Sequence, residues 1–266
     1  MTATDSLRAH WPEYLIEAWA LGMFMVSAAV FSTLFEFPRS SLHQAVPYAA
    51  LRTIIIGVAM GLTAVALIYS PWGKRSGAHM NPSVTLAYLH LGKIQRWDAL
   101  FYVCAQFAGG VLGVVLAGSL LGHAFTDPPV SYAATQPGSL GIVAAFLAEF
   151  AISAAMMATV LTVAGHVRYA RFTGWIAGLL VATYISLEAP ISGMSMNPAR
   201  SFASAAPGMQ WQHLWIYFTA PVLGMLAAAQ WKLQRSAASA LPCAKLIHAD
   251  NVRCIHCGFE PVAGPQ

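Results

Sequence analysis

Two eight-residue segments of the 266-residue chain are identical at five of eight positions: residues 76–83 read SGAHMNPS and residues 192–199 read SGMSMNPA. Each Asn-Pro pair opens an apolar run of about ten residues. Asparagine is a preferred helix N-cap and proline a preferred first helical residue, so each pair is expected to begin a helix. A ten-residue helix is about 15 Å long, half of a bilayer core of roughly 30 Å. The repeat therefore predicts two half-length helices, starting at Asn81 and Asn197, that meet end to end at the middle of a membrane.

The composition places the rest of the chain in a membrane as well. Only 9% of the residues are charged and 58% are hydrophobic, whereas a soluble domain carries about 25% charged residues. Six apolar stretches approach the roughly 20 residues that a spanning helix needs: 14–36, 49–70, 99–122, 140–165, 172–190 and 211–231. No basic segment with a cleavage site precedes the first stretch, so it is expected to be a retained helix and not a signal peptide.

The basic residues predict the orientation of the chain. With the N-terminus in the cytoplasm, the cytoplasmic segments hold eleven of the 14 lysines and arginines: Arg8, Lys74, Arg75, Lys93, Arg96, Arg168, Arg171, Lys232, Arg235, Lys245 and Arg253. The outer side keeps Arg39 and Arg52, while Arg200 lies in the second half-helix. This bias fits the positive-inside rule. We therefore expect a multi-pass protein of the cell (inner) membrane with both termini cytoplasmic, in contact with lipid and with no nucleic-acid partner despite the net charge of +4.

The spacing of the repeat predicts the topology. The two asparagines lie 116 residues apart, and each half, about 12–125 and 140–235, contains two spans, a half-helix and a third span. Because three spans are an odd number, the second half must insert with the opposite topology, as in many membrane transport proteins. The predicted fold is all-α, with six transmembrane helices and two re-entrant half-helices in an inverted repeat over residues 1–235, followed by a cytoplasmic tail, 236–266.

Two acidic residues occupy matching positions inside the first span of each half, Glu17 and Glu149. A carboxylate inside a membrane is costly and marks a function or a required partner. Our preferred interpretation is structural: each carboxylate accepts hydrogen bonds from the irregular backbone that leads into a half-helix, since those groups must be satisfied at membrane depth. The alternative is a proton relay of the kind found in a pump.

The two repeated segments resemble the signature loops of the aquaporin, or major intrinsic protein, family. Val84-Thr85 after the first loop and Arg200-Ser201 after the second fit the resemblance, as does Gln106 in the third span. The resemblance covers about residues 12–235 and implies six tilted helices, two half-helices, a pore in every subunit and a homotetramer. We expect no cofactor for the channel. Ser83 departs from the family pattern, in which most members carry alanine.

The predicted pore centre follows from the two half-helices. Each points its N-terminus, with about half a positive charge, at the same place, so cations and protons meet a barrier there. Asn81 and Asn197 offer amide donors that orient a passing molecule. Arg200, one turn beyond Asn197, is expected to reject cations and orient solutes, although a buried ion pair with Glu188 is the alternative.

The resemblance also implies a selectivity filter made of Met60, Ile185, Met194 and Arg200; without one inserted residue in the loop 70–78, Gly61 would replace Met60. Strict water channels carry an aromatic residue and a histidine there, whereas Ile185 cannot form hydrogen bonds and methionines are apolar and adaptable. Ser201 and the Tyr217-Phe218 pair argue against a glycerol facilitator. We expect a passive channel for water, small uncharged solutes or both that excludes ions and protons, with glycerol and metalloid acids as candidate solutes.

The tail carries a separate pattern. Cys243, His248, Cys254 and Cys257, with His256 as an alternative, match the ligands and spacing of a structural zinc site. In a reducing compartment a metal site is favoured over a disulfide. A redox thiol site and a tail with incidental cysteines remain alternatives.

Two other function classes stay open. A secondary transporter also uses broken helices and inverted repeats, but it needs a titrating or ion-coordinating group in its pathway. A membrane-anchored metal sensor would use the tail as its active part. An enzyme is not expected, since the spans contain no nucleophile–base pair and no catalytic metal motif.

Overall fold

The computed structural model describes residues 1–235, 243–249 and 251–260, and this part of the chain is helical with no strand. Six helices are long and apolar enough to cross a membrane. They are α1 (Ala3–Glu36), α3 (Ala49–Tyr69), α6 (Arg96–Leu121), α8 (Gly141–Ala164), α9 (Thr173–Ser192) and α11 (Leu214–Arg235). Each corresponds to one of the six predicted spans, so the predicted fold class is confirmed.

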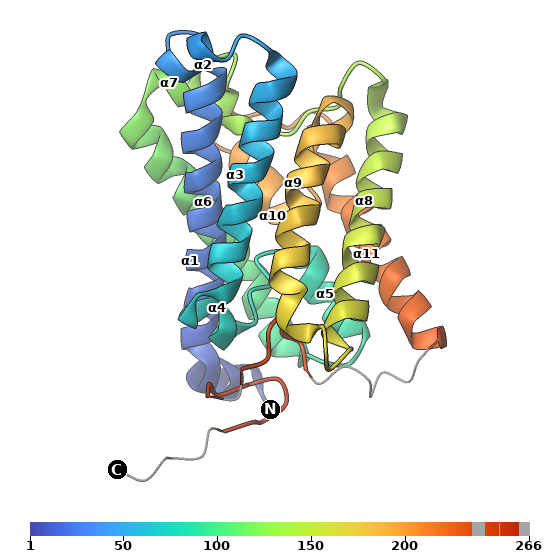
Figure 1. Cartoon of the computed structure of the whole chain (residues 1–266). Coiled ribbons are helices and arrows are strands. Elements are labelled where there is room, and N and C mark those ends of the chain that lie inside the picture. The colour runs from blue at the N-terminus through green and yellow to red at the C-terminus, as the bar shows by residue number, and fades with distance from the viewer. Residues whose placement is uncertain (236–242, 250, 261–266) are drawn as a thin grey trace.

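The first helix is much longer than predicted. It begins at Ala3, not near residue 14, because Thr2 and Asp5 form a reciprocal capping box at its start. Pro12 lies inside the helix without ending it. The extra turns project from the end of the bundle at which the N-terminus lies, here called the N-side (Figure 1).

The two half-length helices begin where the repeat predicts. α5 (Pro82–His90) is capped by Asn81 and α10 (Pro198–Ala205) by Asn197, each with proline in its first turn. Shorter elements complete the described structure: α2 (Ser41–Ala45), α4 (Pro71–Ser76), α7 (His123–Thr126), η1 (Ser131–Ala133) and η2 (Ala170–Phe172). In Figure 1, α2 and α7 lie at the end opposite the N-side, whereas α4 and the tail lie at the N-side.

The spanning helices pack in pairs, α1 on α6, α3 on α9 and α8 on α11. Small residues bring the pairs together, as is common in membranes. A Cβ on Gly109 of α6 would lie 2.0 Å from the carbonyl oxygen of Ala18, and one on Gly61 of α3 would lie 2.5 Å from that of Gly178. These close approaches hold the two helices of each pair together.

Candidate pore and tail cluster

The two asparagine caps meet inside the bundle and cross-link the two halves. The Nδ2 of Asn81 donates to the carbonyl of Met196, and the Nδ2 of Asn197 donates to the carbonyl of Met80, both at 2.7 Å. Each side-chain oxygen meanwhile accepts from the first turn of its own helix, from Ser83 N for Asn81 and from the amides of 199 and 200 for Asn197. The starts of α5 and α10 are therefore held against each other.

The segment before each half-helix has an unusual backbone. Positive φ angles occur at Gly77, Ala78 and Met80 in the first half and at Gly193, Met194 and Met196 in the second. Residues other than glycine rarely adopt this region, and they keep it only where surrounding contacts enforce it. The same pattern in both halves shows that the sequence repeat is also a repeat of conformation.

Glu17 supplies those contacts in the first half. Its carboxylate accepts hydrogen bonds from Ser76 Oγ (2.7 Å), His79 N (3.0 Å), Met80 N (2.7 Å) and Gln106 Nε2 (2.8 Å). The side chain is fully buried. It thereby satisfies two backbone amides that the irregular loop leaves without a helical partner.

Glu149 does the same in the second half, with one partner fewer. Its Oε1 accepts from Ser192 Oγ and Ser195 N, and its Oε2 accepts from Met196 N, all at 2.7 Å. The loop backbone of both halves is thus anchored to a buried carboxylate on a spanning helix.

Two tyrosines complete this scaffold, and the sequence reasoning missed their role. Tyr102 donates to the carbonyl of Ser76 at 2.8 Å, and Tyr217 donates to the carbonyl of Ser192. Both tyrosines are fully buried. Their separation of 115 residues nearly equals the 116 between the two serines, and this shared offset is the signal that could have found them.

A cavity of about 480 Å³ runs along the bundle past both asparagines. Two helical stripes at four-residue spacing line it: Ile56, Met60, Ala64 and Ile68 on α3, and Ala177, Val181, Ile185 and Ala189 on α9. This spacing keeps one face of each helix toward the cavity. Most of the wall is apolar, and its polar residues are Ser32, Glu36, Thr53, His79, Asn81, Ser195, Asn197 and Arg200.

All four residues proposed for the filter, Met60, Ile185, Met194 and Arg200, line this cavity. The alternative Gly61 instead packs against Gly178 of α9. Arg200 donates from Nη1 to Ser204 Oγ at 3.3 Å. Within the described residues it forms no ion pair with Glu188, whose two carboxylate oxygens lack hydrogen-bond partners.

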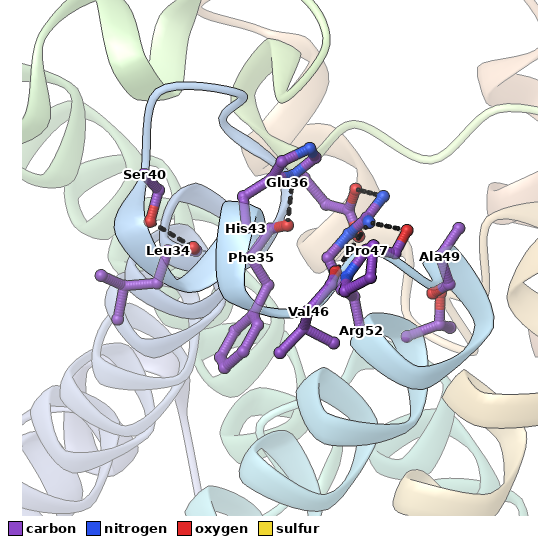
Figure 2. A network of polar contacts seen from close by, with 10 residues as sticks. Leu34, Phe35, Glu36, Ser40, His43, Val46, Pro47, Ala49 and Arg52 are labelled. Carbon is purple, nitrogen blue, oxygen red and sulfur yellow. Dashed lines mark hydrogen bonds and ion pairs between the residues drawn. The ribbon is translucent and has the colours of Figure 1, made fainter.

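An ion pair between Arg52 and Glu36 (Figure 2) lies near α2, at the end of the bundle opposite the N-side. Arg52 is largely buried and faces the carboxylate of Glu36 with Nε at 3.4 Å and Nη2 at 3.2 Å. Its Nη1 donates to the carbonyls of Val46 and Pro47. Glu36 also lines the cavity, so this mouth has a fixed, locally neutral rim.

The tail brings four predicted ligands together. The thiols of Cys243, Cys254 and Cys257 and a ring nitrogen of His248 all lie within 4.8 Å of one another. His256 instead places Nε2 3.2 Å from the carbonyl of Ser76. Residues 236–242, 250 and 261–266 of the predicted tail lie outside the described residues.

The contacts within the cluster shift the pKa values of its thiols in different directions. A hydrogen bond from Cys243 lowers the pKa of Cys254 to about 4, and the same contact raises the pKa of Cys243. Burial raises the pKa of Cys257. One thiolate is therefore stabilised by the fold itself, and thiolate is the form that binds metals.

Six spanning helices and two half-helices meeting in a lined cavity define a channel-type membrane protein. Residues 5–231 match the family model described as "Major intrinsic protein", and the chain belongs to that family. It is 30% identical over 217 residues, 81% of this chain and 74% of the relative, to "Probable aquaporin NIP7-1" of Arabidopsis thaliana.

Two further comparisons agree. The chain is 32% identical over 175 residues to nodulin-26 of Glycine max, covering 65% of this chain and 62% of that protein. A solved structure, the aquaglyceroporin from Plasmodium falciparum, superposes with a TM-score of 0.69 over 87% of this chain and 99% of that one, at 16% identity. This last likeness supports the fold. The protein is an integral, multi-pass membrane channel of the class that passes water and small solutes passively.

Proposed function

We propose that the chain conducts water and small uncharged solutes through the cavity and excludes ions and protons. The carrying observation is the crossed pair of hydrogen bonds between Asn81 and Asn197 and the opposite loops. This pair fixes the N-termini of α5 and α10, each with about half a positive charge, at one point of the cavity. A cation at that point is repelled from both sides.

The asparagines also act on the passing molecule. Each amide has two N–H donors, and one is used in the crossed bond. The second remains for the cavity, which both side chains line. A water molecule that accepts from both amides points its own hydrogens away from the centre, so a continuous proton wire is interrupted.

Selectivity among neutral solutes is assigned to Met60, Ile185, Met194 and Arg200. Arg200 supplies the charge and the donors, while the other three give an apolar, adaptable wall without a second hydrogen-bonding side chain. Such a filter favours solutes with apolar faces more than a strictly water-selective one does. Glycerol and undissociated boric or arsenous acid are the proposed solutes beyond water.

The proposed setting is the cell (inner) membrane, with the N-side in the cytoplasm and four identical subunits per assembly. The excess of lysine and arginine on the N-side supports this orientation. Large apolar side chains are exposed along the outer faces of the spans, among them Leu112 and Leu120 of α6. These apolar faces are suited to contact with lipid or with a neighbouring subunit.

The tail cluster is proposed to bind Zn²⁺. In a tetrahedral zinc site with Zn–S bonds of about 2.3 Å, neighbouring ligand atoms lie about 3.8 Å apart. The observed limit of 4.8 Å lies only slightly above that spacing. Three thiols and one imidazole are, moreover, a ligand set of closed structural zinc sites.

Stopped-flow light scattering on proteoliposomes tests the conduction proposal. We expect excess, non-saturating flux of water and of at least one neutral solute over empty vesicles, with a proton leak no greater than background. No excess for water, glycerol or boric acid, either before or after bound metal is removed with a chelator, would overturn it. Saturable, proton-coupled uptake would favour the secondary-transporter alternative.

A further inference from the structure

The tail folds back onto the N-side mouth of the cavity. Leu246 is one of the cavity-lining residues, although it lies 165 residues after the first asparagine. Its amide donates to the carbonyl of Gly77 at 3.2 Å, in the loop that leads into α5. The Nε2 of His79, another cavity-lining residue, donates to the carbonyl of Ala244 at 2.8 Å. Figure 1 shows this segment crossing the N-side end of the bundle.

The docked segment is buried like a part of the core. Exposure is 0% for Ala244, 3% for Lys245, 8% for Leu246 and 9% for Ile247. The three apolar members belong to the same hydrophobic cluster as the pore wall. The ammonium of Lys245 donates to the carbonyls of Lys74 and Arg253, both at 3.0 Å. A buried lysine held in this way indicates a specific docking geometry.

The four metal-ligand side chains bracket this segment. Cys243 stands directly before residues 244–247 and His248 directly after them. Cys254 and Cys257 approach from a turn in which Gly258 has φ of +74° and donates to the carbonyl of Cys254 at 2.9 Å. In the same turn, His256 stacks on the ring of His79, with the two ring planes 8° apart. One ion bound to all four ligands would close a loop around Leu246.

We propose that a soft divalent metal ion, Zn²⁺ by its ligand set, locks residues 243–249 and 251–257 over the cytoplasmic mouth so that Leu246 obstructs the pore. Loss of the metal releases the segment and opens the mouth. The inference rests on the proposed conduction and adds its regulation. The physical basis is linkage: an ion that binds only the docked tail, at a free concentration one hundred times its Kd, favours docking about a hundredfold.

Metal content of the full-length protein tests the site itself. Purified wild type is expected to hold about one zinc per chain, as a closed structural site does, and C254S/C257S is expected to hold almost none. C104S is the matched control, because it removes a thiol of α6 outside the cluster and should keep the zinc. Wild-type protein without bound metal after loading with Zn²⁺ would overturn the proposal.

Flux in proteoliposomes tests the obstruction. Stripping zinc with a chelator on both sides of the membrane should raise water or solute flux severalfold, with an upper limit of about a hundredfold set by the linkage effect. Re-addition of Zn²⁺ should reverse the rise. L246A should keep its zinc and conduct freely in its presence. L120A is the matched control, since Leu120 is 74% exposed on α6, and it should behave as wild type.

The outcomes separate the regulation from the channel. Zinc-dependent flux in wild type, with zinc-bound L246A open, supports the proposal. Equal flux with and without bound zinc overturns the proposed regulation by zinc but does not affect the proposed conduction. No flux in any form, including stripped L246A, overturns both.

Discussion

Replacement of Glu149 tests whether the buried carboxylates hold the half-helix loops in place. Glu149→Gln keeps one acceptor oxygen for Ser192 and Ser195, but its amide group then faces the N–H of Met196. A buried donor left without an acceptor costs about 1–3 kcal/mol. Glu149→Ala leaves the amides of both Ser195 and Met196 unpaired. On the same basis, this loss of two hydrogen bonds costs about 2–6 kcal/mol.

Thermal unfolding of the purified protein measures these costs. A loss of 1 kcal/mol lowers Tm by about 2–4 °C for 150–250 residues, so Glu149→Gln should lower Tm by several degrees and Glu149→Ala by about twice as much. Glu188→Gln is the matched control, because Glu188 is also buried but neither of its oxygens has a hydrogen-bond partner. Its Tm should be unchanged or higher.

The result that would refute this reasoning is equal Tm for Glu149→Gln and wild type. If proton-coupled uptake were lost at the same time, the carboxylate would belong to a proton relay, and this result would favour the secondary-transporter alternative. A lowered Tm, with the flux of the remaining folded protein independent of pH, would support the structural role.

Three further predictions concern the pore. Ile185→His adds a hydrogen-bonding group to the cavity wall. Since one hydrogen bond is worth about 1 kcal/mol, the ratio of water to glycerol permeability should rise about fivefold. An unchanged ratio in stopped-flow assays would show that Ile185 is not part of the filter. Asn81→Ala removes a helix cap and the hydrogen bond to the carbonyl of Met196, so the free energy of unfolding should fall by about 1–3 kcal/mol. A denaturation midpoint equal to that of wild type would contradict the crossed hydrogen bonds between the two halves. Arg200→Val should increase both glycerol flux and the leak of sodium ions into vesicles; a background sodium leak would argue against charge rejection by Arg200.

The sequence predicted the fold because its strongest signals are local. Apolar length alone identifies a spanning helix, and Asn-Pro determines where α5 and α10 begin. The start of α1 was misjudged, since hydropathy gives no weight to a polar capping box at Thr2, well before the apolar stretch. The signal was present in the spacing of Thr2 and Asp5.

The contacts between the halves could not be predicted in the same way. A repeat places Asn81 and Asn197 at matching positions, but the partners of their amides depend on the left-handed backbone of the facing loop. The clustering of Cys243, His248, Cys254 and Cys257 was predictable from residue type and spacing. Where the tail docks was not, because no pattern in residues 243–247 marks contact with a loop more than 160 residues away.

A high-resolution experimental structure of the protein in a lipid bilayer tests the meeting of the two half-helices most directly. We expect Asn81 Nδ2 and Asn197 Nδ2 each at about 2.7 Å from the carbonyls of Met196 and Met80, with an ordered water molecule within hydrogen-bond distance of both asparagines. Either Asn-Pro pair at the membrane surface, away from any continuous water-filled path, would contradict the proposed channel.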